Sequence, residues 1–103
     1  MSTVSELQGH KLAEGLSIAM GWKSCDIQSA NEMWQKVGLI FKLFPTVSIT
    51  KLSAVEKNRT SAGTIGDGDY EAHVCTSVVR ADDPTTALFR AVVYHKFGST
   101  IEL

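Results

Sequence analysis

The sequence has little of what several classes of protein require. Its charges nearly cancel, because ten Lys and Arg stand against eleven Asp and Glu and give a net charge of −1. It therefore lacks the positive excess by which general nucleic-acid binders hold phosphates. Its apolar stretches are short, and none approaches the roughly 18–20 residues that a membrane-spanning helix needs. The opening residues lack the basic-then-apolar pattern of a secretory signal, so we expect a cytosolic protein.

Cysteine and proline are also scarce, with two residues of each. Cys25 and Cys75 belong to no Cys-x-x-Cys pair, so we expect small buried thiols rather than a disulfide framework or a metal site. What is present is an ordinary globular composition, 44% hydrophobic and 20% charged. A chain of 103 residues with this composition is typical of one domain, residues 1–103, with its own core.

Apolar periodicity and end signals predict helices near both ends of the chain. In residues 4–20 apolar side chains recur at spacings near four, and Gly21 suits the left-handed position that ends a helix. Asp83 followed by a proline predicts the start of a helix over residues 84–97, because an acidic cap and a proline at the first helical position are typical of helix starts. We expect Gly98 to close that helix in a left-handed conformation.

A further helix is predicted between them, over residues 30–43. Ser29 and Glu32 fit a capping box, in which each side chain accepts a hydrogen bond from a backbone amide of the first turn. The apolar residues that follow recur at helical spacing, and we expect them to line the core. The core residues predicted here are Val37, Ile40, Phe41 and Phe44.

Two stretches predict strands. Residues 46–55 are rich in β-branched side chains, and residues 69–80 alternate between apolar and polar positions. Residues 56–68 are polar and glycine-rich, which predicts a long hairpin loop, and residues 99–103 add a short edge strand. The fold class that follows is α+β, with a small antiparallel sheet of two to four strands sandwiched between helices in the order α-α-β-β-α(-β).

The loop contains the best candidate for a ligand site. Lys57 and Arg59 are suited to pairing with phosphate, and neutral donors adjoin them, while aromatic residues elsewhere are candidates to stack on a base. A solvated hairpin tip is the competing and simpler interpretation. The full set of candidate ligand-binding residues is Lys57, Arg59, Thr60, Ser61, Gly63, Trp22 and Tyr70.

Other constellations are weaker. The acidic run 67–71 departs from a calcium loop, because Ala72 stands where the pattern needs glycine and Val78 where it needs a bidentate Glu. His73 and Cys75, two residues apart, form only a weak candidate for a nucleophile pair, and a half-buried strand face accounts for them better. We therefore predict no catalytic residues, no metal and no cofactor.

Several short motifs resemble small bacteriophage proteins of the ABA-sandwich and NinX-like type. The similar segments are the run 11–15 with the Met-Gly-Trp turn 20–22, the helix carrying Ala30 and Trp34, the runs 70–72 and 81–91, and the ending 96–102. They span nearly the whole chain, whereas loop 56–68 departs from the family. The resemblance implies a phage origin and a three-layer fold, and it brings no catalytic residues.

Three functions remain open from these observations. The first is a phage anti-defence protein that binds and sequesters a small, anionic, nucleotide-derived immune signal without catalysis, in the cytosol of the host bacterium. The second is an inhibitor that binds a host defence protein, of the anti-CRISPR or anti-restriction kind. The third is a small hydrolase that uses His73, Cys75 or the carboxylates of Asp67 and Asp69. We also expect a homo-oligomer, because a small sheet with an open edge leaves apolar surface uncovered.

Overall fold

The computed structural model describes residues 2–23, 29–60 and 62–103. Within them the chain is α+β, as the sequence predicts, with one core cluster that runs from Val4 to Ile101. Cys25 and Ser61, both singled out above, lie outside the described residues. The elements in chain order are β1 (Ser2–Thr3), the 3-10 helix η1 (Val4–Glu6), α1 (Gly9–Met20), α2 (Ala30–Leu43), β2 (Val47–Lys51), α3 (Ala54–Lys57), β3 (Ile65–Gly66), β4 (Tyr70–Val74), β5 (Ser77–Ala81), α4 (Pro84–Phe97) and β6 (Thr100–Ile101).

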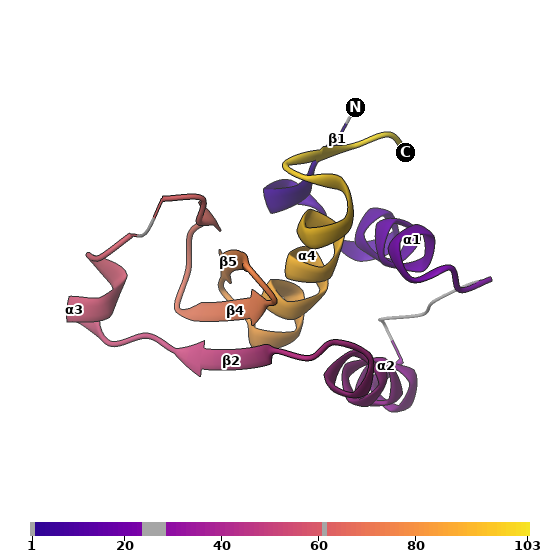
Figure 1. Ribbon diagram of the computed structural model, residues 1–103, viewed down its shortest axis with the longest axis horizontal. Coiled ribbons are helices and arrows are strands. Elements are labelled where there is room, and N and C mark those ends of the chain that lie inside the picture. Colours follow the sequence, from indigo (N-terminus) through magenta and orange to yellow (C-terminus); the bar gives the residue numbers. More distant parts are fainter. Residues whose placement is uncertain (1, 24–28, 61) are drawn as a thin grey trace.

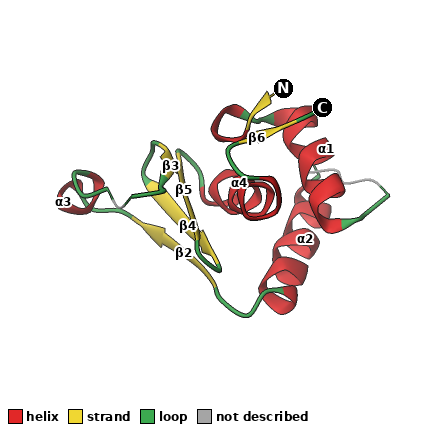
Figure 2. Cartoon of the chain, turned by 45° about the horizontal axis from the view of Figure 1, so that its top comes forward, coloured by secondary structure: helices red, strands yellow, loops and turns green. Residues whose placement is uncertain are grey.

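The larger sheet has four strands in the order β2-β4-β5-β3. β2 pairs with β4 and β4 with β5, both antiparallel, whereas β3 is parallel to β5. β1 and β6 form a separate antiparallel pair that brings the two ends of the chain together (Figure 2). The strand predicted over residues 99–103 is present only as Thr100–Ile101, and it pairs with the N-terminus in a separate sheet instead of extending the larger one.

Helix α4 is the middle layer of the fold. It packs on the sheet face that carries Ala72, Val74 and Val79, and α1 and α2 lie on its other side (Figure 1). The sheet thus packs against helices as predicted, but α1 and α2 lie behind α4 rather than on the second face of the sheet. The reason is that α4 is apolar on both sides, since Leu88, Phe89 and its neighbours are buried all around the helix.

The first helix is shorter than predicted. The chain forms a 3-10 turn at Val4–Glu6, and α1 begins only at Gly9. Gly9 has a φ of +57°, a backbone conformation that redirects the chain between the two elements. The predicted end is confirmed, because Gly21 is left-handed and its amide donates to the carbonyls of Ile18 and Ser17.

The strand predicted over residues 69–80 is wrong, because it is a hairpin. β4 and β5 are joined by a two-residue turn at Cys75 and Thr76, with Cys75 at φ +54°. Val74 pairs with Ser77 on either side of the turn. The alternation of apolar residues continues through the turn, so the pattern gave no sign of a break.

The strand predicted over residues 46–55 is likewise shorter, and the loop is more ordered than expected. β2 ends at Lys51, and Ser53 begins the short helix α3 with a complete capping box to Glu56. At Ser29, where a capping box was predicted, the Ser hydroxyl accepts a hydrogen bond from the Glu32 amide. The other half of the box is not formed, because Oε1 of Glu32 lies 3.8 Å from Nζ of Lys36 instead.

The ends of α4 and the core face of α2 complete the comparison with the sequence. Asp83 caps α4 by accepting from the amides of Thr85 and Thr86, as predicted. Gly98 has a positive φ of 82° with a ψ of −156°, which is not the left-handed helical conformation that was expected.

Phe41 was placed wrongly in the core. Val37 and Ile40 are buried and Phe44 packs against the core, but 47% of the surface of Phe41 is exposed. Helix α2 is an outer helix that packs on one side only, and its apolar arc is wider than that contact. Phe41 lies on the part of the arc left in solvent.

Candidate functional site

Lys57, the first cation of the predicted ligand site, is already paired within the chain. Its Nζ donates a hydrogen bond to Oδ1 of Asp69 at 2.7 Å. This hydrogen bond raises the pKa of Lys57 and lowers the pKa of Asp69. Both side chains are exposed to solvent, so the pair is available for exchange with another anion, but an incoming phosphate must compete with the carboxylate.

The rest of the loop is held by its backbone. Arg59 and Thr60 are exposed, and the carbonyl of Arg59 accepts a hydrogen bond from the guanidinium of Arg80. The carbonyl of Gly63 accepts a hydrogen bond from the hydroxyl of Tyr94 at 2.9 Å. The contacts of this segment therefore anchor the loop to β5 and α4.

The loop requires glycine at two positions for structural reasons. Gly66 and Gly68 have φ values of +77° and +151°. A Cβ at Gly66 would lie 2.4 Å from the carbonyl oxygen of Arg80, and one at Gly68 would lie 2.1 Å from the carbonyl carbon of Ala81. The backbone of the loop approaches β5 too closely for a side chain, so these glycines serve packing.

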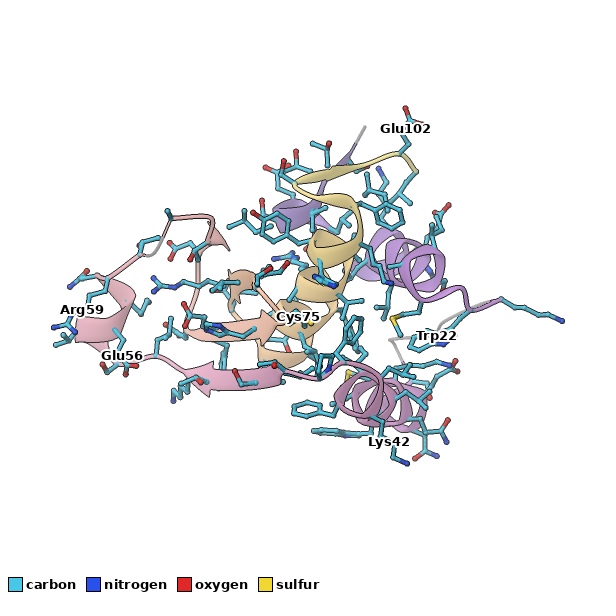
Figure 3. The ribbon with its side chains drawn as sticks, in the orientation of Figure 1. Trp22, Lys42, Glu56, Arg59, Cys75 and Glu102 are labelled. Carbon is cyan, nitrogen blue, oxygen red and sulfur yellow. The ribbon has the colours of Figure 1, made fainter. Side chains whose placement is uncertain are left out.

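The two aromatic residues of the predicted site lie elsewhere. Trp22 is at the opposite end of the molecule from Arg59 (Figure 3). Nζ of Lys36 lies 4.5 Å from the centroid of the Trp22 ring. Trp22 also borders an open depression of about 350 Å³ along α1. Tyr70 packs against the core from β4. The structure brings Lys57, Arg59 and Thr60 into one segment and does not bring Trp22 to it.

A polar cluster that the sequence analysis missed lies beneath α3. Arg80 on β5 is only 5% exposed. Its Nε donates to Oε1 of Glu71 at 3.2 Å, and its two terminal nitrogens donate to the carbonyls of Glu56, Lys57 and Arg59. The guanidinium thus binds the C-terminal carbonyls of α3, where cations are favoured.

Glu71 is shared between two hydrogen-bond partners. Besides Arg80, Nε2 of His73 lies 3.0 Å from its Oε2. Burial by itself raises the pKa of Glu71, but the hydrogen bonds with His73 and Arg80 outweigh burial and the pKa is lowered. Glu71 and Arg80 are cross-strand partners. Their spacing in the sequence predicts this pair only if the position of the hairpin turn is known.

Three of the residues on which the hydrolase hypothesis depends form hydrogen bonds within the chain. His73 pairs with Glu71 and Asp69 with Lys57, while Asp67 accepts a hydrogen bond from the amide of Gly68 at 2.9 Å. Cys75 lies in the β4–β5 turn and is half-buried. Among the residues that the structure describes, no three His, Cys, Asp or Glu side chains group in a way that could hold a metal ion.

Two aromatic side chains of α2 are exposed with a glycine between them, and we call Trp34, Gly38 and Phe41 the aromatic stripe. Trp34 is 64% exposed and Phe41 47%. The spacing of seven residues places both rings on one side of the helix, with Gly38 between them. A Cβ added at Gly38 would meet nothing within 4 Å. The stripe is therefore two exposed rings with a gap that reaches down to the helix backbone.

Comparisons with models of protein families, with curated proteins and with solved structures found no match to this chain. Of the helices in residues 2–23, 29–60 and 62–103, none is long and apolar enough to cross a membrane.

Proposed function

We propose that this chain is a non-catalytic binding protein that acts on a partner protein through the aromatic stripe of α2. The observation that carries the proposal is the exposure of Trp34 and Phe41 on α2, beside the helix face that buries Val37 and Ile40. Aromatic residues are enriched in protein interfaces, and tryptophan is among the residues that contribute most binding energy there. Exposed apolar side chains that form one patch are typical of a surface that binds a partner.

The shape of the stripe indicates the chemistry of the partner. Gly38 lies between Trp34 and Phe41 along the helix, and a Cβ there would meet nothing within 4 Å, so an apolar side chain of the partner has room to approach the helix backbone. Lys42 follows Phe41 in the sequence and is exposed, and a cation near the stripe favours an acidic group on the partner. The partner surface that fits is a projecting apolar residue flanked by Asp or Glu.

The resemblance to small bacteriophage proteins gives the direction for the partner's identity. It supports a host defence effector, which this protein inhibits by covering a surface that the effector needs. The sequestration of a nucleotide-derived signal by loop 56–68 has less support, because Lys57 is paired with Asp69 and Trp22 lies at the far end of the molecule. Arg59 and Thr60 are the exposed residues on which that alternative depends.

The experiment is phage plating on hosts that each carry one defence system, with the chain supplied from a plasmid. We expect the wild type to restore plating on at least one host. Trp34→Ala with Phe41→Ala should abolish that effect, because these exposed rings contribute to binding and little to folding. Leu39→Ala is the matched control, since Leu39 is an exposed apolar residue on the other side of α2.

The variant Lys57→Ala with Arg59→Ala separates the two mechanisms. Under the proposal it restores plating as the wild type does. Loss of the effect in this variant, together with full activity of the Trp34 and Phe41 variant, would establish sequestration by the loop instead. A wild type that restores plating on none of the hosts would remove host defence as the target.

A further inference from the structure

The outer edge of β2 is open in the described part of the chain. β2 is an end strand of the four-stranded sheet, paired with β4 on one side only. The amide of Cys75 donates to the carbonyl of Thr46 at 2.8 Å, and that of Leu52 to Asp69 at 2.7 Å. Hydrogen-bonded positions alternate along an antiparallel ladder. It follows that Val47, Ile49 and Lys51 direct their backbone groups to the open edge.

The strand has few of the features that prevent edge pairing. Its sequence from Val47 to Lys51 is Val-Ser-Ile-Thr-Lys, which is rich in β-branched residues and contains neither proline nor a bulge residue. A single Lys at the end of the strand is its only charge. Natural sheets usually protect an open edge with inward-pointing charges, proline or a covering segment.

The strand is also complementary to itself. When two copies pair in antiparallel fashion about Ile49, Ile49 faces its own copy, Ser48 faces Thr50, and Val47 faces Lys51. The hydroxyls of Ser48 and Thr50 can form a hydrogen bond across the pair, and no like charges oppose each other. In this register the outward backbone groups of the three residues meet each other as donors and acceptors.

The flanking elements fit the same two-fold arrangement. Figure 3 places Lys42 at the α2 end of β2 and Glu56 at the α3 end, so a two-fold axis at Ile49 brings the Lys42 end of one copy toward the Glu56 end of the other. In the view of Figure 1, α2 extends past β2 on the side away from β4, whereas α3 lies on the same side of β2 as β4. The projecting helix of each copy thus faces the recessed side of the other.

We propose that the chain forms a two-fold dimer in which the β2 strands of two copies pair in antiparallel fashion, joining the two sheets into one. The partner on this edge is a second copy, because the register, the charges at the two ends and the shape all match under a two-fold rotation. The dimer leaves the proposed function of the aromatic stripe as a separate question, and the variants below leave Trp34 and Phe41 unchanged.

The test uses two double variants of exposed β2 residues and measures mass by sedimentation across the micromolar range. Ser48→Lys with Thr50→Lys sets like charges opposite each other at both symmetric positions. Ser48→Glu with Thr50→Lys sets opposite charges there, and it keeps Lys beside Glu71 and Glu beside His73 within each copy. We expect the wild type and the Glu/Lys variant to dimerise, and the Lys/Lys variant to dissociate about tenfold more readily or worse.

Far-ultraviolet circular dichroism of each variant establishes that it is folded. A wild type that is monomeric at high-micromolar concentration would overturn the proposal. So would a dimer in which both variants associate equally, because the interface would then lie elsewhere, or one in which both variants are monomeric, because the charge pairs would not be those of this register.

Discussion

Arg80 and Glu71 face each other across the β4–β5 pair, and Nε of Arg80 donates to Oε1 of Glu71 at 3.2 Å. The same guanidinium donates to three carbonyls at the end of α3. A nearly buried cation therefore joins the hairpin to the segment after β2. We therefore expect the placement of residues 53–60 to depend on this arginine.

Arg80→Ala should lower the free energy of unfolding by about 3 kcal/mol, because it leaves Glu71 without its cation and three carbonyls without their donor. Arg59→Ala, which removes an exposed side chain in the same segment, should change stability by less than about 0.5 kcal/mol. Urea denaturation of both variants provides the measurement. Equal effects at the two positions would show that the guanidinium of Arg80 does not anchor α3.

The lowered pKa of Glu71 has a defined consequence for acid stability. A carboxylate whose folded-state pKa lies below its ordinary value of 4.5 stabilises the fold fully above that value. The stabilisation is lost as the pH falls through the lower, folded-state pKa. Denaturation of the wild type and of Glu71→Gln between neutral and acidic pH should show the larger stability loss for the wild type below pH 4.5. Identical pH profiles would refute this assignment.

Phe41 and Ile40 are neighbours in sequence but differ in burial, and their truncation should differ accordingly. Ile40 is fully buried and Phe41 about half exposed. Ile40→Ala is expected to cost about 2–5 kcal/mol, and Phe41→Ala less than about 1 kcal/mol. Thermal and chemical denaturation measure both. A loss of stability from Phe41→Ala as large as that from Ile40→Ala would show that Phe41 is part of the core.

Gly38 and Gly68 predict opposite effects of the same substitution. Gly38 is inside α2 with open space around it, so Gly38→Ala should stabilise the protein by about 0.5–1 kcal/mol. Gly68 has a φ of +151° and approaches the backbone of Ala81, so Gly68→Ala should be strongly destabilising. The sign of the change in melting temperature distinguishes them. A stable Gly68→Ala protein would mean that the loop can leave β5.

Local signals in the sequence predicted α2, α4 and the end of α1, but they missed the start of α1 and the short helix α3. The caps at Ser29 and Asp83 and the left-handed Gly21 are confirmed, because capping depends on residues three or four positions apart. The positions at which burial depends on other elements were missed. Phe41 belongs to the apolar arc of α2, but whether that arc is covered depends on how α1 and α4 pack against it.

The same limit explains the missed polar cluster. Glu71 and Arg80 are nine residues apart, and only the turn at Cys75 brings them side by side. The turn has no Asn-Gly or Asp-Gly signal of the kind that marks a two-residue hairpin. The partner of Lys57 was missed for a related reason, since Asp69 is twelve residues away and pairs with it only because α3 folds back toward β4.

The most direct test of the central claim uses the fluorescence of Trp34. In a Trp22→Phe variant Trp34 is the remaining tryptophan, and it is largely exposed. Titration with the effector identified by plating should shift its emission to shorter wavelength and reduce its quenching by acrylamide, because the partner covers the ring. An effector that binds with the wild-type affinity while the emission and quenching of Trp34 stay unchanged would contradict the account.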